Sequence, residues 1–220
     1  SVVVTGVQTC ALPILSMGSL VTASSCAPSG DSSLKQNVKE GEDGQFLFIG
    51  DDIAIAQTEY GKVQGYLLNH VYTFLGVPYG ADTSGKNRFM PPQKPEPWTD
   101  VRPAVFYGNT APQRMENRWP NNYGTFADHW NYWDVSEDCL YLNVWTPGIA
   151  DGKKRPVLVW LHGGGFTNGS GIEQDGYHGE NISREGNIVF CSINHRLGPI
   201  GFSDLSGVGG EAYKDSGNVG

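Results

Sequence analysis

The hydrophobic pattern divides the chain into a polar beginning and a region of short apolar runs that starts near Phe46. The first three runs are separated by turn-forming residues and lie at residues 53–58, 62–68 and 71–75. Short apolar runs joined by tight turns are typical of antiparallel strands. This part of the sequence therefore predicts a small antiparallel meander.

The later apolar runs are continuous rather than alternating, and they lie at residues 140–145, 157–161 and 187–194. Continuous runs of this length are typical of strands that are buried on both faces of a parallel sheet. We expect them to be the first core strands of a mostly parallel sheet in an α/β protein. We also expect a hairpin-like connection at 148–155 and a helical turn at 181–185.

Residues 93–135 show little periodicity but contain many aromatic side chains. A loop this long is usually functional or disordered, and its aromatic content favours an ordered loop that packs on itself. The alternative is that these aromatic residues form a wall of a binding site. The sequence leaves both interpretations open.

The first 44 residues do not look like part of a folded domain. Residues 1–14 resemble translated sequencing-adapter read-through, and the core of an export signal is the alternative. Residues 15–44 look like the remnant of a bacterial export signal followed by a flexible linker, with small residues before Cys26 as at a lipoprotein cleavage site. We therefore expect residues 1–44 to pack against nothing. We also expect an exported protein, in which Cys26 is either a lipid anchor or an ordinary cysteine.

The run at 157–161 ends in a loop that begins with His162 and three consecutive glycines, Gly163, Gly164 and Gly165. Glycine allows positive φ and close approach of another group, and ligands bind at the carboxyl ends of strands in open α/β sheets. A His-Gly-Gly-Gly turn at that place directs backbone N–H groups at one point, as a developing oxyanion requires. A plain glycine turn is the alternative, and the neighbouring segments favour the oxyanion-binding interpretation.

Those neighbours are the run Ser-Glu-Asp-Cys-Leu-Tyr-Leu-Asn-Val-Trp-Thr-Pro at 136–147 and the run Asn-His-Arg-Leu-Gly-Pro-Ile-Gly-Phe at 194–202. With the glycine loop between them, they resemble the type-B carboxylesterase family, which includes cholinesterases and bacterial para-nitrobenzyl esterases. The resemblance runs from about Asp51 to the last residue. It implies the N-terminal part of an α/β-hydrolase fold over 45–220: the meander, then the first strands of the central sheet.

The resemblance also implies hydrolysis of small-molecule carboxylic esters through an acyl-enzyme, with Gly164 and Gly165 donating N–H groups to the oxyanion and His162 bracing their loop. The 220 residues contain no Gly-x-Ser-x-Gly motif, and the nearest approach, at 201–205, lacks the second glycine. Because the chain lacks an initial Met and stops inside a family motif, we expect a truncated domain that is inactive by itself. A non-catalytic, cholinesterase-like binding or adhesion module is the alternative.

Several other residues take structural roles from the resemblance. Arg88 and Glu137 match a buried family ion pair, and Arg196 expects an acidic partner downstream of the 220 residues. His195 stands where the family usually has Tyr, so one aromatic packing contact is in doubt. Cys139 usually forms a disulfide in the family. Since no cysteine occurs between Phe89 and Asp138, we expect Cys139 and Cys191 to be buried free thiols.

Composition excludes several other classes of function. The formal net charge is −8, the isoelectric point is near 5.0, and no basic stripe appears, so a nucleic-acid partner is not expected. No apolar run reaches the roughly 18 residues that a membrane-spanning helix needs. The cysteine and histidine spacing does not resemble a zinc site, and no cofactor is expected.

Overall fold

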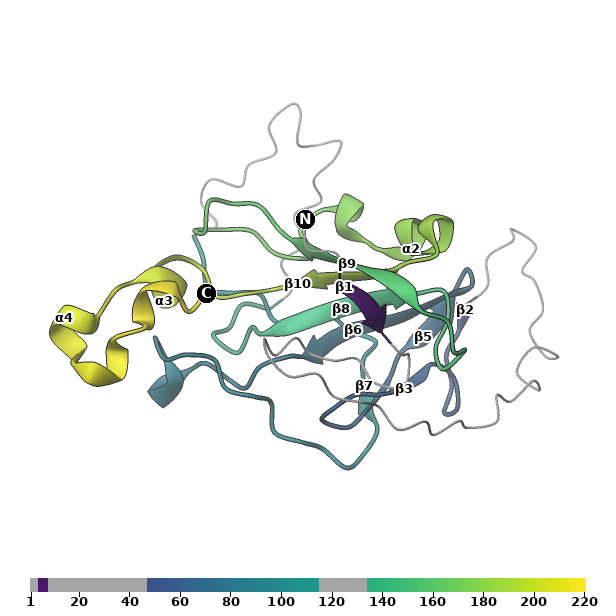
Figure 1. Ribbon diagram of the computed structural model, residues 1–220, viewed down its shortest axis with the longest axis horizontal. Helices are drawn as coiled ribbons and strands as arrows, with labels where there is room; N and C mark the ends of the chain where they lie inside the picture. Colours follow the sequence, from purple (N-terminus) through teal and green to yellow (C-terminus); the bar gives the residue numbers. More distant parts are fainter. Residues whose placement is uncertain (1–3, 8–46, 115–133) are drawn as a thin grey trace.

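The computed structural model describes residues 4–7, 47–114 and 134–220, which form two sheets (Figure 1). The larger sheet has seven strands in the order β1-β9-β10-β8-β6-β5-β2. Its strands are β1 (Val4–Val7), β2 (Leu47–Phe48), β5 (Tyr66–Leu68), β6 (Val71–Pro78), β8 (Tyr141–Thr146), β9 (Arg155–Leu161) and β10 (Val189–Ile193). The smaller sheet contains β3 (Ile55–Gln57), β4 (Lys62–Gln64) and β7 (Arg102–Pro103).

The helical elements of the described residues are short. The α-helices are α2 (Glu180–Gly186), α3 (Gly198–Phe202) and α4 (Ser206–Gly209). Single 3-10 turns lie at Gly85–Asn87, Asp175–Tyr177, Glu211–Tyr213 and Ser216–Asn218. The helical turn predicted at 181–185 is confirmed by α2, which lies in the connection from β9 to β10.

The predicted meander is wrong in one respect, because its strands belong to two different sheets. β3 pairs with β4 in the smaller sheet, whereas β5 pairs with β6 in the larger one. The change occurs at Gly65, where a Cβ atom would lie only 1.9 Å from the carbonyl oxygen of Thr73. No side chain fits there, so the continuous run at 62–68 breaks into two strands at its glycine.

The larger sheet is also less parallel than predicted over the described residues. β9 and β10 are parallel, and the other neighbouring pairs are antiparallel. The connection at 148–155 is not a hairpin, because β10 lies between β8 and β9. A parallel pair needs a crossover connection, and α2 provides one for β9 and β10.

The core lies on β6, β8 and β10. Phe74, Val144 and Trp145 are almost fully buried, and Phe190 packs against Trp145 with ring centroids 5.8 Å apart. Helix α2 is fixed to this core by Ser183, whose hydroxyl donates a 3.0 Å hydrogen bond to the carbonyl oxygen of Trp145. The core therefore supports the central strands and leaves β9 toward one edge.

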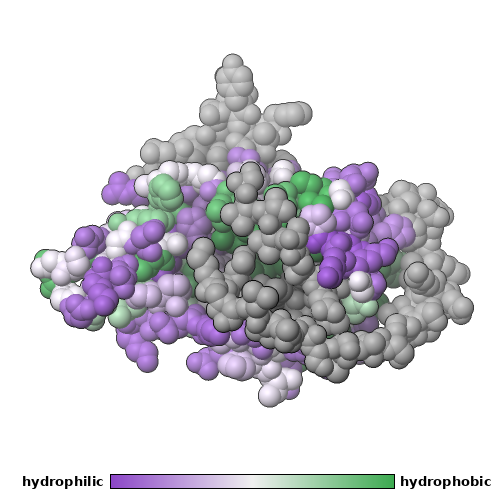
Figure 2. Space-filling view, in the orientation of Figure 1, coloured by the Kyte–Doolittle hydropathy of each residue, from purple (hydrophilic) through white to green (hydrophobic). Residues whose placement is uncertain are grey.

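Strand β9 differs from the prediction of burial on both faces. Its later side chains are exposed, with Leu158 at 42% and Leu161 at 64%. Figure 2 shows hydrophobic patches on an otherwise largely hydrophilic face of the molecule. An exposed apolar strand near a sheet edge is a site where further polypeptide can pack.

The prediction that residues 1–44 pack against nothing is wrong for β1. This strand pairs antiparallel with β9, with Val4 opposite Val157 and Val7 opposite Arg155. The outer edge of β9 offers unpaired N–H and C=O groups, and an extended segment rich in β-branched residues satisfies them. Residues 1–3 and 8–46, including Cys26, lie outside the described part of the chain.

No helix within residues 47–114 and 134–220 is long and apolar enough to cross a membrane. The predicted aromatic loop at 93–135 can be compared with the structure only at residues 93–114 and 134–135, because residues 115–133 lie outside the described residues. In its described part, Trp98 is anchored by a 2.7 Å hydrogen bond from its indole N–H to the carbonyl oxygen of Lys62.

Candidate functional site

The glycine loop follows directly from the carboxyl end of β9, on the strand that pairs in parallel with β10. Gly164 and Gly165 both have positive φ, at 128° and 62°, and Phe166 follows at 62°. A Cβ atom on Gly164 would lie 1.8 Å from the carbonyl oxygen of Asn168. Gly164 is therefore required both by its backbone conformation and by the closeness of the chain that returns past it.

The loop is closed by bonds to a single carbonyl group. The oxygen of Gly164 accepts hydrogen bonds from the N–H groups of Thr167 (3.2 Å) and Asn168 (3.3 Å) and from the hydroxyl of Thr167 (3.0 Å). Within the described part of the chain, the N–H groups of Gly164 and Gly165 donate to nothing. Two adjacent N–H donors without a protein partner can bind an oxygen atom that carries negative charge.

His162 immediately precedes the three glycines and is 9% exposed. Its Nδ1 atom is 2.7 Å from the carbonyl oxygen of Gly163, which can only accept, so Nδ1 carries the proton in this contact. The ring stacks on His195 with centroids 4.8 Å apart and planes inclined by 16°. His195 therefore supplies an aromatic contact to His162.

Two cavities meet at the loop and share Gly163, Gly164 and Asn168 among their lining residues. The larger has a volume of about 850 Å³, and polar side chains line it, among them Gln113, Arg114 and Glu173. The other is about 560 Å³, with a mainly apolar lining. The loop thus lies between a cavity of mixed polar and apolar lining and a mainly apolar one.

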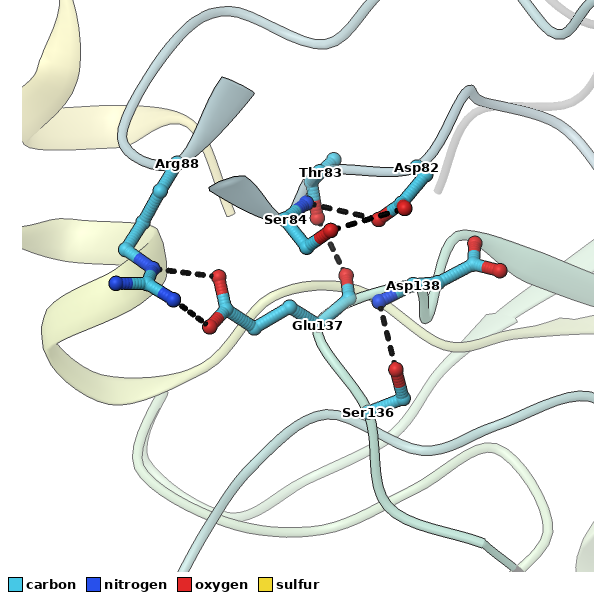
Figure 3. A network of polar contacts seen from close by, with 7 residues as sticks. All are labelled: Asp82, Thr83, Ser84, Arg88, Ser136, Glu137 and Asp138. Atoms are coloured by element: carbon cyan, nitrogen blue, oxygen red, sulfur yellow. Dashed lines mark hydrogen bonds and ion pairs between the residues drawn. The ribbon is translucent and has the colours of Figure 1, made fainter. Parts of the chain in front are cut away.

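Arg88 and Glu137 form the predicted ion pair between two distant segments (Figure 3). The Nε atom of Arg88 is 2.7 Å from Oε2 of Glu137, and Nη2 is 2.5 Å from Oε1. The hydrogen bonds that Arg88 donates to Glu137 raise the pKa of Arg88. The prediction that this pair is buried is wrong, because the Arg88 side chain is 47% exposed. Solvent therefore screens much of the interaction.

The backbone beside this pair is fixed by shorter-range contacts (Figure 3). The hydroxyl of Thr83 donates to the carbonyl oxygen of Glu137 at 2.5 Å, and the N–H of Asp138 donates to the hydroxyl of Ser136 at 3.1 Å. Asp82 accepts from the N–H (2.8 Å) and the hydroxyl (2.9 Å) of Ser84. These bonds hold the early loop against the segment that enters β8.

Arg196 is a buried cation, with 1% of its side chain exposed. Its Nη1 atom donates to the carbonyl oxygen of Met90 at 2.8 Å, but Nε and Nη2 have no partner within the described residues. Burial lowers the pKa of Arg196. The acidic partner expected downstream of the 220 residues stays a prediction.

Cys139 and Cys191 are free and buried, as predicted. Burial raises the pKa of each thiol to about 12, so neither is a reactive thiolate at neutral pH. Within the described ranges, no cluster of three or more His, Cys, Asp or Glu side chains could hold a metal ion.

Two side chains that the sequence did not single out organise the surroundings of the loop. Asn194 accepts a 2.7 Å bond from the N–H of Gly171 and donates a 3.0 Å bond to the carbonyl oxygen of Asn109. Gln113 binds the main chain of Gly169 in both directions. A lone amide in a polar segment carries no sequence signal for such contacts, because they depend on chain segments far apart in sequence.

The comparison that decides the family is the match of residues 52–220 to the model of the carboxylesterase family. The chain belongs to the carboxylesterase family. Relatives include the phenmedipham hydrolase of Pseudarthrobacter oxydans, 44% identical over 157 residues, which cover 71% of this chain and 30% of that protein. The para-nitrobenzyl esterase of Bacillus subtilis is 39% identical over 165 residues, covering 74% of this chain and 31% of the relative.

Solved structures of similar proteins are carboxylesterases as well. An esterase from Clostridium hathewayi that hydrolyses aliphatic aromatic polyesters matches with a TM-score of 0.72 and 38% identity, covering 80% of this chain and 33% of that one. A carboxylesterase from Geobacillus stearothermophilus matches with a TM-score of 0.65. This carboxylesterase-family chain therefore has part of the α/β-hydrolase fold, and it spans about 30% of the length of its curated relatives.

Proposed function

We propose that the protein to which this chain belongs is a serine carboxylesterase acting on small-molecule esters, and that this chain supplies its oxyanion hole. The donors are the N–H groups of Gly164 and Gly165. One observation carries the proposal: both groups lack a protein partner in the described residues, and both glycines line a cavity at the end of β9. Each such donor typically lowers the barrier of acyl transfer by about 2.7–4 kcal/mol.

The proposed reaction proceeds through an acyl-enzyme. A serine hydroxyl attacks the ester carbonyl carbon while a histidine takes its proton, and the carbonyl oxygen becomes the oxyanion held at Gly164 and Gly165. Collapse expels the alcohol, which receives the proton from the histidine, and water then releases the acid by the same route. The 220 residues contain no Gly-x-Ser-x-Gly motif, so the proposal assigns the nucleophile, acid and base to sequence outside them.

The remaining site residues serve as supports in this proposal. His162 is assigned a structural role, since its Nδ1 proton is committed to the carbonyl oxygen of Gly163 and its ring is stacked on His195. Arg88 and Glu137 fix the early loop against the segment before β8. None of these three residues touches the reacting atoms in the proposed mechanism.

The test compares two purified proteins: the 220-residue chain and the product of the complete reading frame. We expect the second, and not the first, to release nitrophenol from a short-chain para-nitrophenyl ester, with activity abolished by a serine-directed inhibitor. Turnover by the 220-residue chain would reveal an unrecognised nucleophile. A complete reading frame without Gly-x-Ser-x-Gly and without turnover would instead support the non-catalytic binding module.

We further propose that residues 1–14 are not native to the domain, that 15–44 are an export-signal remnant and linker, and that 45–220 are the domain. The protein would then be bacterial and exported, with Cys26 as a candidate lipid anchor. Metabolic labelling with a radioactive fatty acid, comparing the native chain with Cys26→Ser, tests the anchor. Deleting residues 1–14 tests the first boundary. If these residues are native to the domain, their deletion removes β1 from the edge of β9 and should lower the solubility of the protein.

A further inference from the structure

Gln113 makes a reciprocal contact with the backbone of Gly169, 56 residues away in the sequence. Its Nε2 atom donates to the carbonyl oxygen of Gly169 at 2.9 Å, and its Oε1 atom accepts from the N–H of Gly169 at 2.8 Å. Nε2 also lies 3.2 Å from the carbonyl oxygen of Ala111. The amide therefore reproduces the two-way bonding of neighbouring strands, and a flipped amide would lose all three bonds.

Gly169 is in turn packed against the glycine loop. A Cβ atom added to it would lie 2.4 Å from the carbonyl oxygen of Gly163 and 2.5 Å from Nδ1 of His162. Its φ of 111° is one that glycine adopts without strain. The backbone of Gly169 is thus in direct contact with the residues that immediately precede the two proposed oxyanion donors.

The turn has one other main-chain anchor, on the side of α3, where the N–H of Gly198 donates a 2.7 Å bond to the carbonyl oxygen of Phe166. The remaining bonds of residues 164–168 end on the carbonyl oxygen of Gly164 and fix the shape of the turn, but they do not fix the position of its Gly169 end. Gln113 connects the end of that turn to the segment 110–113, which is anchored by the bridge between Thr110 and Val135. Orientation of the turn decides where the N–H groups of Gly164 and Gly165 lie.

We propose that Gln113 is a positioning residue for the oxyanion loop, acting through Gly169. This inference rests on the proposed esterase function, and it adds a residue that acts on the oxyanion donors through the backbone of Gly169 rather than on the reacting atoms. Loss of the contact would release the Gly169 end of the turn, while Phe166 stays bonded to Gly198. Since a displacement of about 1 Å can cost roughly 100-fold in rate, we expect an effect on kcat rather than on KM.

The decisive variants are Gln113→Ala and Gln113→Glu in the product of the complete reading frame. Gln113→Glu keeps the size of the side chain and the acceptor for the N–H of Gly169, but it cannot donate to the carbonyl oxygen when ionised. We expect both variants to lower kcat by about 10- to 100-fold with KM changed less than about threefold. Gln93→Ala is the matched control, because Gln93 is exposed, its side chain bonds only Pro91 among the described residues, and it lines neither cavity.

A second measurement separates this inference from the proposed function. Hydrogen–deuterium exchange in peptides covering residues 162–169 should be faster in both Gln113 variants than in the native protein or Gln93→Ala. An active native enzyme whose Gln113 variants keep their kcat would overturn the positioning role alone. An inactive native protein with faster exchange in the variants would overturn the esterase function and, with it, the catalytic meaning of the contact.

Discussion

Asp151 and Arg155 form a bidentate ion pair at the start of β9. Nη1 of Arg155 lies 3.0 Å from Oδ1 of Asp151, and Nη2 lies 2.6 Å from Oδ2. The Arg155 side chain is 4% exposed, and its Nε atom donates a further 3.0 Å bond to Oδ1 of Asn187, the residue that ends α2. Arg155 thus joins the connection from β8, the strand β9 and the crossover helix. Strand β9 leads directly into the glycine loop, so this cation fixes the near end of the element that carries the site.

Asp151→Asn should therefore destabilise the protein more than an ordinary surface change. The hydrogen bond from Arg155 holds the pKa of Asp151 below its usual value, and removing the charge leaves a buried guanidinium without its counterion. Loss of one partner of a buried pair commonly costs about 3–5 kcal/mol, and partial exposure of Asp151 favours the lower end, about 3 kcal/mol. Urea unfolding at pH 7 followed by tryptophan fluorescence measures the difference.

Glu211→Gln is the matched control for that measurement. It breaks the 2.7 Å pair with Lys214, in which both side chains are more than half exposed, so we expect a change below about 0.5 kcal/mol. Equal losses for the two variants would show that burial of Arg155 contributes nothing special.

His178 should make stability depend on pH around neutrality. Burial lowers its pKa, against the opposing effects of Glu180 and Asp175, and its ring lies edge-on to Trp145 with centroids 5.1 Å apart. The folded state therefore binds a proton less readily than the unfolded chain. As pH falls below the unfolded pKa of about 6.5, the unfolded chain gains the proton first, so the free energy of unfolding decreases.

The experiment compares unfolding midpoints of the native protein and His178→Gln between pH 8 and pH 5. The difference between them should be constant above about pH 7.5 and should change below about pH 6.5, with a slope of at most about 1.4 kcal/mol per pH unit. A difference that stays constant over the whole range would mean that His178 titrates alike in both states.

The sequence predicted the glycine loop but not the assembly of the sheets. The loop and the two buried thiols follow from local sequence and the Arg88–Glu137 pair follows from the family resemblance, and the structure contains each of them. Strand neighbours depend instead on long-range pairing. Nothing in the run at 62–68 indicates that the carbonyl oxygen of Thr73 will lie 1.9 Å from the place of a Cβ atom on Gly65.

Long-range pairing also explains the other differences between the predicted and the observed fold. The order β9-β10-β8 places a later strand between two earlier ones, which a turn-rich connection at 148–155 cannot reveal. The pairing of β1 with β9 depends on an open sheet edge rather than on any feature of residues 4–7 alone. The exposure of Arg88 likewise depends on which chain segments cover it, so the family resemblance predicted the partner but not the exposure.

Substitutions at Gly164 and Gly165 should separate loss of folding from loss of activity. A side chain on Gly164 would collide with the carbonyl oxygen of Asn168, whereas the Cβ position on Gly165 has no atom within 4 Å. Gly165→Val is therefore strained only by its φ of 62°, at a cost of about 1–3 kcal/mol. In the complete protein, we expect Gly165→Val to remain folded but to lose about 100-fold or more in kcat, because one oxyanion donor is displaced.

Gly164→Val should instead disrupt the turn and lower the thermal midpoint as well as activity. Circular dichroism and esterase assays on both variants make the comparison. A fully active Gly165→Val enzyme would remove Gly165 from the oxyanion hole, whatever Gly164→Val does.

Arg196 offers a test of whether the complete reading frame supplies a missing partner. Within the described residues its guanidinium is buried, and two of its nitrogens bond to nothing, which is a costly state for a cation. Replacement of an inadequately paired buried ion by an apolar side chain of similar size is often stabilising, by about 1–4 kcal/mol. Arg196→Met should therefore stabilise the 220-residue chain against urea, although it loses the bond to Met90.

In the product of the complete reading frame, the same substitution should act in the opposite direction. A carboxylate from additional sequence would pair with Arg196, and Arg196→Met would then strand that carboxylate in the interior at a cost of about 3–5 kcal/mol. Urea unfolding of the four proteins gives both differences under the same conditions. A stabilising effect in both backgrounds would show that no such carboxylate reaches Arg196, and a destabilising effect in both would show that its bond to Met90 outweighs the unpaired nitrogens.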